Sequence, residues 1–163
     1  MPGRDSVDVA AVRVGDPEVD TLLDALTADL AAAGYTEEES FGYSGEQLEA
    51  QAVHLVGSWR DGRLVGIGGL EVGDDGVGEL KRFFVVPEHR GHGVADAVVE
   101  ALLAHARDRG LTLVRLETGD AQHAAIGFYR RHGFVDIPRF GPYVASARSV
   151  CMERTLGAPT NRA

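Results

Sequence analysis

The chain has 163 residues, a mass of 17.4 kDa and 44% hydrophobic residues, which suits one folded domain around a single core. No apolar run approaches the ~20 residues that cross a bilayer, and the start, MPGRDSVDV, lacks the apolar stretch of a signal peptide, so we expect a cytoplasmic location and no membrane partner. The net charge of −9 and pI near 5.0 argue against nucleic acid as a partner, and a single cysteine, Cys151, excludes an intrachain disulfide.

The N-terminal part predicts a strand followed by a helix. Residues 7–14 alternate loosely between apolar and polar side chains, as strand residues do. Asp16-Pro17 then supplies a helix cap followed by proline at the first helical position, and apolar residues recur at helical spacing up to about residue 30. The acidic segment 35–52 predicts a short helix and a mobile cover that carries Phe41 and Tyr43.

A strand hairpin is predicted next. Residues 53–59 and 63–70 have strand character and are joined through Asp61-Gly62, a typical hairpin turn. The second strand is interrupted by glycine, which predicts a bulge at Gly66, Gly68 and Gly69. After another glycine-rich turn, residues 79–86 form a further strand.

The C-terminal half alternates helices and strands. In chain order it predicts a helix to about residue 109, a strand over 111–117, a helix over 121–132 capped by Asp120, a short strand over 135–137, a loop over 138–147 and a last strand over 148–156. No internal repeat or domain boundary is visible. We therefore expect one domain over 1–163, with a core over about 7–156 and flexible tails at 1–6 and 157–163.

The most informative segment is the run Arg90-Gly91-His92-Gly93-Val94-Ala95, between the strand over 79–86 and the following helix. Two glycines at such a junction let the backbone curl tightly, so that its N–H groups point into one concavity. These donors and the positive end of the helix dipole form a binding place for phosphate. The sequence therefore predicts an anion site formed by Arg90, Gly91, His92, Gly93, Val94 and Ala95.

A second pattern, GDAQHAAIGFYRRHGF, follows downstream. The first segment resembles motif A of the GNAT superfamily of N-acetyltransferases, Arg/Gln-x-x-Gly-x-Gly/Ala, and the second resembles that family's Asn-x-x-Ala-x-x-Leu-Tyr-x-x-x-Gly-Phe. The second motif is matched by Ala125, Tyr129, Gly133 and Phe134, whereas Gln122 replaces the usual Asn and Phe128 the usual Leu.

The resemblance implies an α/β (α+β) GNAT fold with a mixed sheet of about six to seven strands and about four helices. In this fold two central strands splay apart and the acetyl-pantetheine arm lies between them. Here they are the strands that end at Val86 and Glu117. The cosubstrate would be acetyl-CoA, with its pyrophosphate on the amides of His92 to Ala95 and on Arg90.

The resemblance also assigns chemical roles. The backbone N–H of Val85 would polarise the thioester carbonyl at a bulge near that point, and the Gln122 amide would contact the pantetheine. Tyr129 would be the general acid for the departing thiolate, with Tyr143 as its alternative. Glu79 would help to deprotonate the amine, with Glu117 as the second candidate.

Several functions stay open. The leading one is acetyl transfer to a primary amine, a small molecule, by direct transfer in a ternary complex. The alternatives are a protein N-terminal or lysine acetyltransferase and a non-catalytic CoA-binding module. The acidic first half, with 17 acidic and 4 basic residues over 1–80, favours a cationic acceptor if it lines the site. A homodimer is one option for assembly. The histidines lack metal-site spacing, so no metal is expected.

Overall fold

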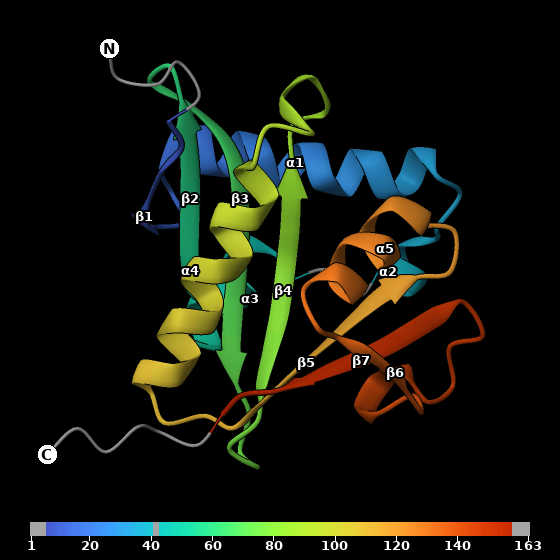
Figure 1. Cartoon of the computed structure of the whole chain (residues 1–163). Coiled ribbons are helices and arrows are strands. Elements are labelled where there is room, and N and C mark those ends of the chain that lie inside the picture. Colours follow the sequence, from blue (N-terminus) through green and yellow to red (C-terminus); the bar gives the residue numbers. More distant parts are fainter. Residues whose placement is uncertain (1–5, 41–42, 158–163) are drawn as a thin grey trace, which may run out of the picture.

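The computed structural model describes residues 6–40 and 43–157, and within them seven strands form one sheet. They are β1 (Asp8–Val12), β2 (His54–Arg60), β3 (Arg63–Val72), β4 (Gly78–Val85), β5 (Leu113–Gly119), β6 (Val135–Ile137) and β7 (Ser149–Thr155). Their order across the sheet is β1-β2-β3-β4-β5-β7-β6 (Figure 1). Most of the expected tails, residues 1–5 and 158–163, lie outside the described residues, and so does Phe41.

The sheet opens between β4 and β5. These two strands are parallel, and they pair only at Gly78 with Val114 and at Glu79 with Arg115. Beyond that point they diverge, while β4 stays paired with β3 and β5 with β7 (Figure 1). The expected splay of two central strands in a mixed sheet is therefore confirmed.

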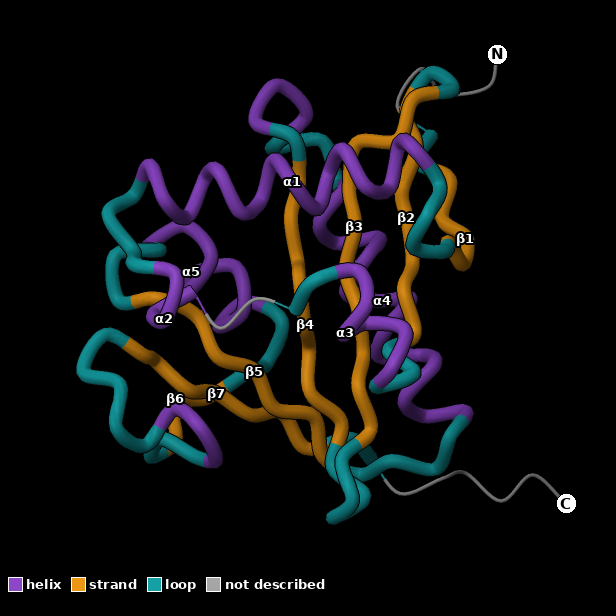
Figure 2. Tube along the Cα trace, turned by 180° about the vertical axis from the view of Figure 1, so that it is seen from behind, coloured by secondary structure: helices purple, strands orange, loops and turns teal. Residues whose placement is uncertain are grey.

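Helices cover both faces of the sheet. The helix α1 (Pro17–Ala32) crosses one face, against β3 and β4, and α4 (Val94–Asp108) packs on the other, against β2 and β3 (Figures 1 and 2). The predicted cap of α1 is confirmed, because the Asp16 side chain accepts a hydrogen bond of 3.0 Å from the Glu18 amide.

The remaining helical elements are short. They are α2 (Glu37–Ser40), α3 (Gly45–Ala50), α5 (His123–Arg131) and the 3₁₀ turns Pro87–His89 and Gly141–Tyr143. The helix α5 begins later than expected, after Gln122, and Asp120 does not cap it. The Asp120 carboxylate instead accepts from Arg148 Nε at 3.2 Å and from the Tyr35 hydroxyl at 3.4 Å. The Asp120 side chain therefore binds residues that are distant in the sequence and does not cap α5.

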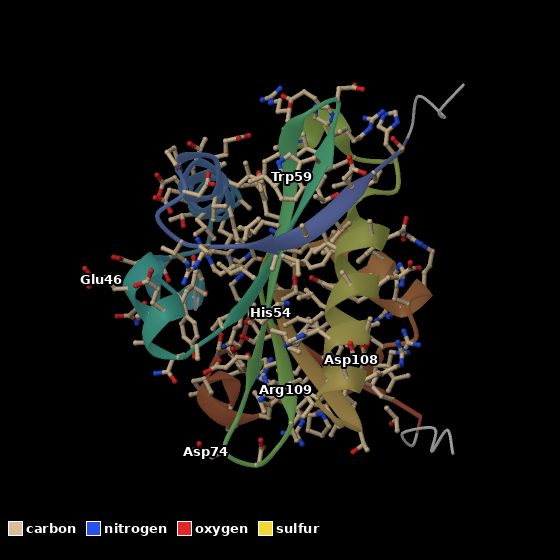
Figure 3. All side chains as sticks on the ribbon, turned by 90° about the vertical axis from the view of Figure 1, so that its left-hand side faces the viewer. Glu46, His54, Trp59, Asp74, Asp108 and Arg109 are labelled. Carbon is tan, nitrogen blue, oxygen red and sulfur yellow. The ribbon has the colours of Figure 1, made fainter. Side chains whose placement is uncertain are left out.

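Glycines in β3 let α4 lie close to the sheet. A Cβ atom at Gly66 would be 2.6 Å from the Val94 side chain, and one at Gly68 would be 2.8 Å from Val98. Val94 and Val98 are themselves almost fully buried. His54 of β2, labelled in Figure 3, adds a second contact between sheet and helix. Its ring stacks on His105 of α4 with centroids 3.7 Å apart.

The predicted irregularity at these glycines is confirmed, but the extra residue lies on the neighbouring strand. Ile67 pairs with Phe84 and Gly69 with Lys81, so Arg82 and Phe83 both oppose the single Gly68. Arg82 has a φ of +54°, a left-handed backbone conformation that residues other than glycine rarely adopt. The bulge expected near Val85 therefore lies two to three residues earlier in β4.

The bulge decides which faces the β4 side chains occupy. Leu80 and Phe83 pack in the core on the α4 side, and Phe84 packs with the α1 residues on the other. Lys81 and Arg82 are consecutive, yet Lys81 contacts Tyr43 and Arg82 contacts α1. In a regular strand they would point to opposite faces. No helix within the described ranges is long and apolar enough to span a membrane.

Candidate active site

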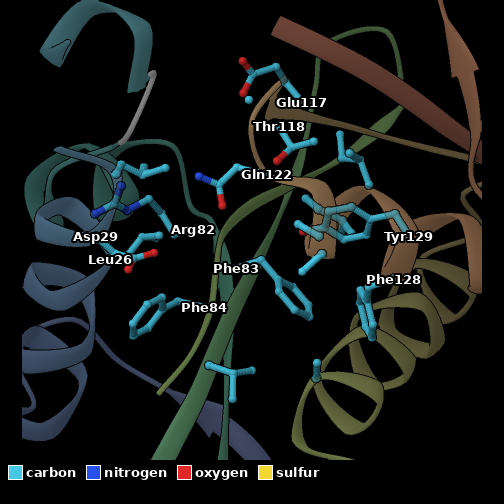
Figure 4. A pocket seen from close by; sticks show the side chains of 18 of the residues that line it. Leu26, Asp29, Arg82, Phe83, Phe84, Glu117, Thr118, Gln122, Phe128 and Tyr129 are labelled. Atoms are coloured by element: carbon cyan, nitrogen blue, oxygen red, sulfur yellow. The ribbon is translucent and has the colours of Figure 1, made fainter. Parts of the chain in front are cut away.

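A cavity of about 550 Å³ occupies the opening between β4 and β5. Its lining comes from α1, α2, β4, the Arg90–Ala95 loop, β5 and α5 (Figure 4). The loop end carries Arg90, Gly91, Gly93 and Ala95, and the β5 end carries Glu117 and Thr118. One continuous space therefore joins the predicted anion site to a carboxylate.

The Arg90–Ala95 loop has the predicted backbone. Gly91 and Gly93 have φ values of +80° and +81°, and Gly93 is the N-cap residue of α4. No atom lies within 4 Å of the place where either Cβ would be, so this curl opens outward. The first-turn amides of α4 have no partner within the helix, which leaves them available to an anion. His92 is exposed, and Val94 is buried in the core.

Arg90 ties this loop to the end of β4. Its Nε donates a hydrogen bond of 3.0 Å to the Val85 carbonyl, and its guanidinium lies 5.7 Å from the centre of the Phe84 ring. The Val86 amide donates to Val65 of β3 at 2.9 Å. Because successive amides of a strand point to opposite edges, the Val85 amide faces the opening toward β5. Val85 also lines the cavity.

Asp96 would place a carboxylate beside a bound anion, but its side chain has another partner. Its Oδ1 lies 2.7 Å from Nε2 of His132, the residue that caps the C-terminal end of α5. This contact joins the N-terminal turn of α4 to α5. The helices α4 and α5 are thus joined beside the Arg90–Ala95 loop.

Gln122 and Tyr129 both line the cavity (Figure 4). Gln122 is the residue before α5, and its side chain makes no cap hydrogen bond, so the amide is directed to the cavity. Tyr129 is 6% exposed, and its ring makes edge-to-face contacts with Phe83, Phe128 and Phe134. Burial, and then the Glu117 charge, raise the pKa of its phenol well above the ordinary value. The hydroxyl is thereby kept protonated.

Glu79 and Tyr143, by contrast, belong to a closed cluster. The Tyr143 hydroxyl donates to Glu79 Oε2 at 2.5 Å, and Lys81 Nζ lies 2.7 Å from the same oxygen and 3.0 Å from the Tyr143 hydroxyl. Burial and the Glu79 charge raise the pKa of Tyr143 far above its usual range. Lys81 and Tyr143 line the cavity, but Glu79 does not.

Glu117 is placed differently. Its side chain lines the cavity, and burial raises the pKa of this carboxyl to about 7, against the opposing effects of Ser149 and Lys81. The Ser149 hydroxyl of β7 donates to Glu117 Oε2 at 2.5 Å. A carboxylate whose pKa lies near neutral pH is suited to exchange protons there. Ser149 was not predicted from the sequence, because a serine at a strand start carries no local signal of that role.

The comparisons with known proteins agree with this geometry. The model of the family described as "Acetyltransferase (GNAT) family" matches residues 21–134. The chain is similar to the IAA acetyltransferase of Azospirillum brasilense, with 35% identity over 133 residues that cover 73% of this chain and 87% of the relative.

Two solved structures are also similar. A Klebsiella pneumoniae protein described as an acyl-CoA N-acyltransferase superposes with a TM-score of 0.80 and 32% identity, covering 94% of this chain and 99% of the other. The PaiA N-acetyltransferase of Thermoplasma acidophilum, solved in complex with coenzyme A, shares the fold with a TM-score of 0.74 at 18% identity, covering 93% of this chain and 99% of the other. The chain belongs to the GNAT family of acetyltransferases.

Proposed function

We propose that the protein transfers an acetyl group from acetyl-CoA to a primary amine of a small molecule, by direct transfer within a ternary complex. The observation that carries this proposal is the single cavity that joins the glycine loop at the start of α4 to Glu117. Anion binding and proton removal, two of the requirements of the reaction, would thereby be met in one space. The coenzyme A complex of the similar Thermoplasma fold supports the choice of cosubstrate.

The residues that would hold the cosubstrate fit its chemistry. The first-turn amides of α4 and the Arg90 guanidinium supply donors and positive charge for a pyrophosphate. The opening between β4 and β5 offers the Val85 amide to the thioester oxygen, and Gln122 offers an amide to the pantetheine arm. These are the roles expected from the sequence, and they remain proposals.

Glu117 is our choice for the general base. It would accept a proton from the incoming ammonium group, so that the free amine nitrogen bonds to the thioester carbon and the carbon–sulfur bond then breaks. The nitrogen loses a second proton as the amide forms, and this proton balances the one that the thiolate gains. Tyr129 would donate a hydrogen bond or its proton to the leaving thiolate. Glu79 is less suited to the base role because Lys81 and Tyr143 already occupy its Oε2 atom and its side chain does not line the cavity.

A small acceptor suits the cavity better than a peptide. Its end distant from the Arg90 loop is bounded by α1 and by Tyr35, Glu39 and Ser40, and Tyr35 is itself held by the Ala121 amide at 2.8 Å. We infer that this boundary leaves room for a small acceptor rather than for an extended peptide. The hydroxyl-bearing Tyr129, the candidate acid, lines the cavity, and this supports an enzyme over a non-catalytic CoA-binding module.

A thiol-release assay with acetyl-CoA and a panel of primary amines tests the proposal. We expect release of free CoA thiol with at least one amine, and acetylated product of the matching mass. Glu117→Gln keeps the side-chain shape but removes the base, so it should lower kcat/KM by about 10²–10⁴-fold while acetyl-CoA affinity is retained. Absence of thiol release with every amine, despite acetyl-CoA binding in calorimetry, would support the non-catalytic alternative.

A further inference from the structure

Two consecutive basic residues of β4 have opposite electrostatic surroundings. Lys81 Nζ lies 2.7 Å from Glu79 and 3.8 Å from Glu71, and it also lies over the Tyr43 ring at 4.6 Å. Arg82 has no such compensation, since no carboxylate in residues 6–40 and 43–157 lies within 4.0 Å of its guanidinium. The carboxylate of Asp24 acts on Arg82 from beyond that distance, so within the described residues the positive charge of Arg82 has no direct ion pair.

The guanidinium of Arg82 is also incompletely hydrogen-bonded. One terminal nitrogen donates to the Leu23 carbonyl at 3.0 Å and to the Thr27 hydroxyl at 2.6 Å. The Nε atom is buried and has no acceptor among the described residues. Burial lowers the pKa of Arg82, and the charge of Asp24 offsets this effect only in part. An unpaired cation in such a position is costly to the fold, and an anionic ligand would relieve that cost.

The bulge places this charge in the cavity. With regular pairing of β4, Arg82 would point to the α4 face with the core residues, but the left-handed backbone at φ +54° turns it to the α1 face. There it lines the cavity together with Asp29 (Figure 4). Glu39 also lines the cavity. Glu117 and Thr118 line the same cavity from β5, across the opening. A strained backbone that directs a charge into a pocket is typical of functional sites.

We propose that Arg82 binds a carboxylate of the acceptor, so that the substrates are amines that also carry an acid group, as amino acids do. This inference rests on the proposed function and names its substrate class. The amine of the acceptor would lie toward Glu117, and its carboxylate would receive charge-assisted hydrogen bonds from the guanidinium. The acidic residues Asp29 and Glu39 at the same end would exclude a second acid group and favour one carboxylate per acceptor.

The test compares amino acids with their own carboxamides as acceptors, because the two members of a pair have nearly the same shape but only the acid carries the negative charge. A charge-assisted hydrogen bond supplies about 10–100-fold in kcat/KM, and we expect the wild-type protein to prefer the acid of a pair by that factor. Arg82→Gln should lower kcat/KM for the acid and leave kcat/KM for the amide unchanged. The ratio of the two kcat/KM values, acid over amide, should then be near one. Arg82→Lys should restore part of the preference.

Thr27→Val is the matched control. It removes the hydroxyl that Arg82 contacts on α1 but leaves the charge, so it should lower the unfolding temperature and keep the acid preference. Two results would overturn the carboxylate assignment: equal kcat/KM values for acid and amide in the wild-type protein, or an equal fall in both kcat/KM values in Arg82→Gln. Arg82 would then serve only to connect β4 with α1. Absence of thiol release with every amine would instead overturn the proposed function, and this inference with it.

Discussion

The Ser149 hydroxyl donates a 2.5 Å hydrogen bond to Oε2 of Glu117, and this contact links the last strand to the candidate base. Ser149 is 5% exposed and pairs in register with Gly119, two residues beyond Glu117 on β5. The hydrogen bond lowers the pKa of Glu117, whereas burial raises it to about 7. The balance between these two effects decides at which pH the carboxylate is available as a base.

Ser149→Ala should shift the pH dependence of catalysis without removing the base. A base is active when deprotonated, so kcat/KM should rise with pH through about 7 in the wild-type protein. Loss of the serine hydrogen bond disfavours the charged carboxylate, and we expect the midpoint to move up by about one pH unit with the plateau at high pH retained. A pH profile measured on both proteins checks this. An unshifted midpoint in the variant would mean that Ser149 does not act on the base.

Glu79→Gln should act mainly on stability. The change removes the carboxylate that Lys81 contacts at 2.7 Å, and it leaves Glu71 at 3.8 Å as the remaining counter-charge. We expect the free energy of unfolding to fall by about 1–3 kcal/mol. The pH–rate profile should keep its shape and plateau, with its midpoint moved slightly down because the Glu79 charge helps to raise the pKa of Glu117. Chemical denaturation and a pH–rate series measure the two effects. If the variant keeps its stability but loses the rate near neutral pH, the base role belongs to Glu79.

Tyr129→Phe should lower kcat by about 10²-fold or more with acetyl-CoA affinity nearly unchanged, because only the hydroxyl offered to the thiolate is removed. Tyr143→Phe is the natural comparison. Its hydroxyl is engaged with Glu79 and Lys81, so its loss should reduce stability more than turnover. Steady-state kinetics with calorimetry of acetyl-CoA binding separates the two variants. Full turnover in Tyr129→Phe with loss in Tyr143→Phe would reverse the assignment.

Gly93→Glu should weaken acetyl-CoA binding by at least about tenfold, because it puts a carboxylate where the pyrophosphate approaches the α4 amides. Gly110→Glu is a matched control at the other end of the same helix. Both glycines have a left-handed backbone, with φ +81° and +75°, and open space at the Cβ position. The two variants should therefore carry similar strain but differ in affinity. Equal affinities by calorimetry would contradict the phosphate assignment.

The stacked pair of His54 and His105 should make the protein sensitive to acid. Burial, His105 and Arg109 lower the pKa of His54 below its ordinary 6.5, so the folded state takes up its proton at lower pH than the unfolded chain. The contribution of His54 to the free energy of unfolding is fully present above pH 6.5. It is lost as the pH falls from 6.5 through the pKa of His54 in the folded protein. His54→Gln should flatten the fall in unfolding temperature on acidification.

The exposed His123, at the start of α5, supplies the control for this prediction, and His123→Gln should leave the acid response unchanged. Thermal unfolding followed from neutral to acidic pH measures both variants. A wild-type protein whose unfolding temperature stays constant as the pH falls through 6.5 would show that this pair is not a source of acid sensitivity.

The sequence by itself determined the features that depend on contiguous residues. The capped start of α1, the left-handed glycines before α4 and the strands on either side of the opening follow from local backbone preferences and apolar spacing, and all were predicted. The two motifs at Arg90–Ala95 and Gln122–Phe134 were sufficient for the family, because each is a short contiguous segment whose pattern can be read without the tertiary structure.

Only the tertiary structure decided how the side chains of distant segments act. Glu79 and Glu117 look alike in sequence, but Lys81 and Tyr143 engage the first, while burial and Ser149 tune the second. The position of the bulge, and with it the direction of Arg82, depends on the pairing of β4 with Gly68 of β3. Such properties arise from desolvation and from contacts between residues far apart in the chain, and no local pattern encodes them.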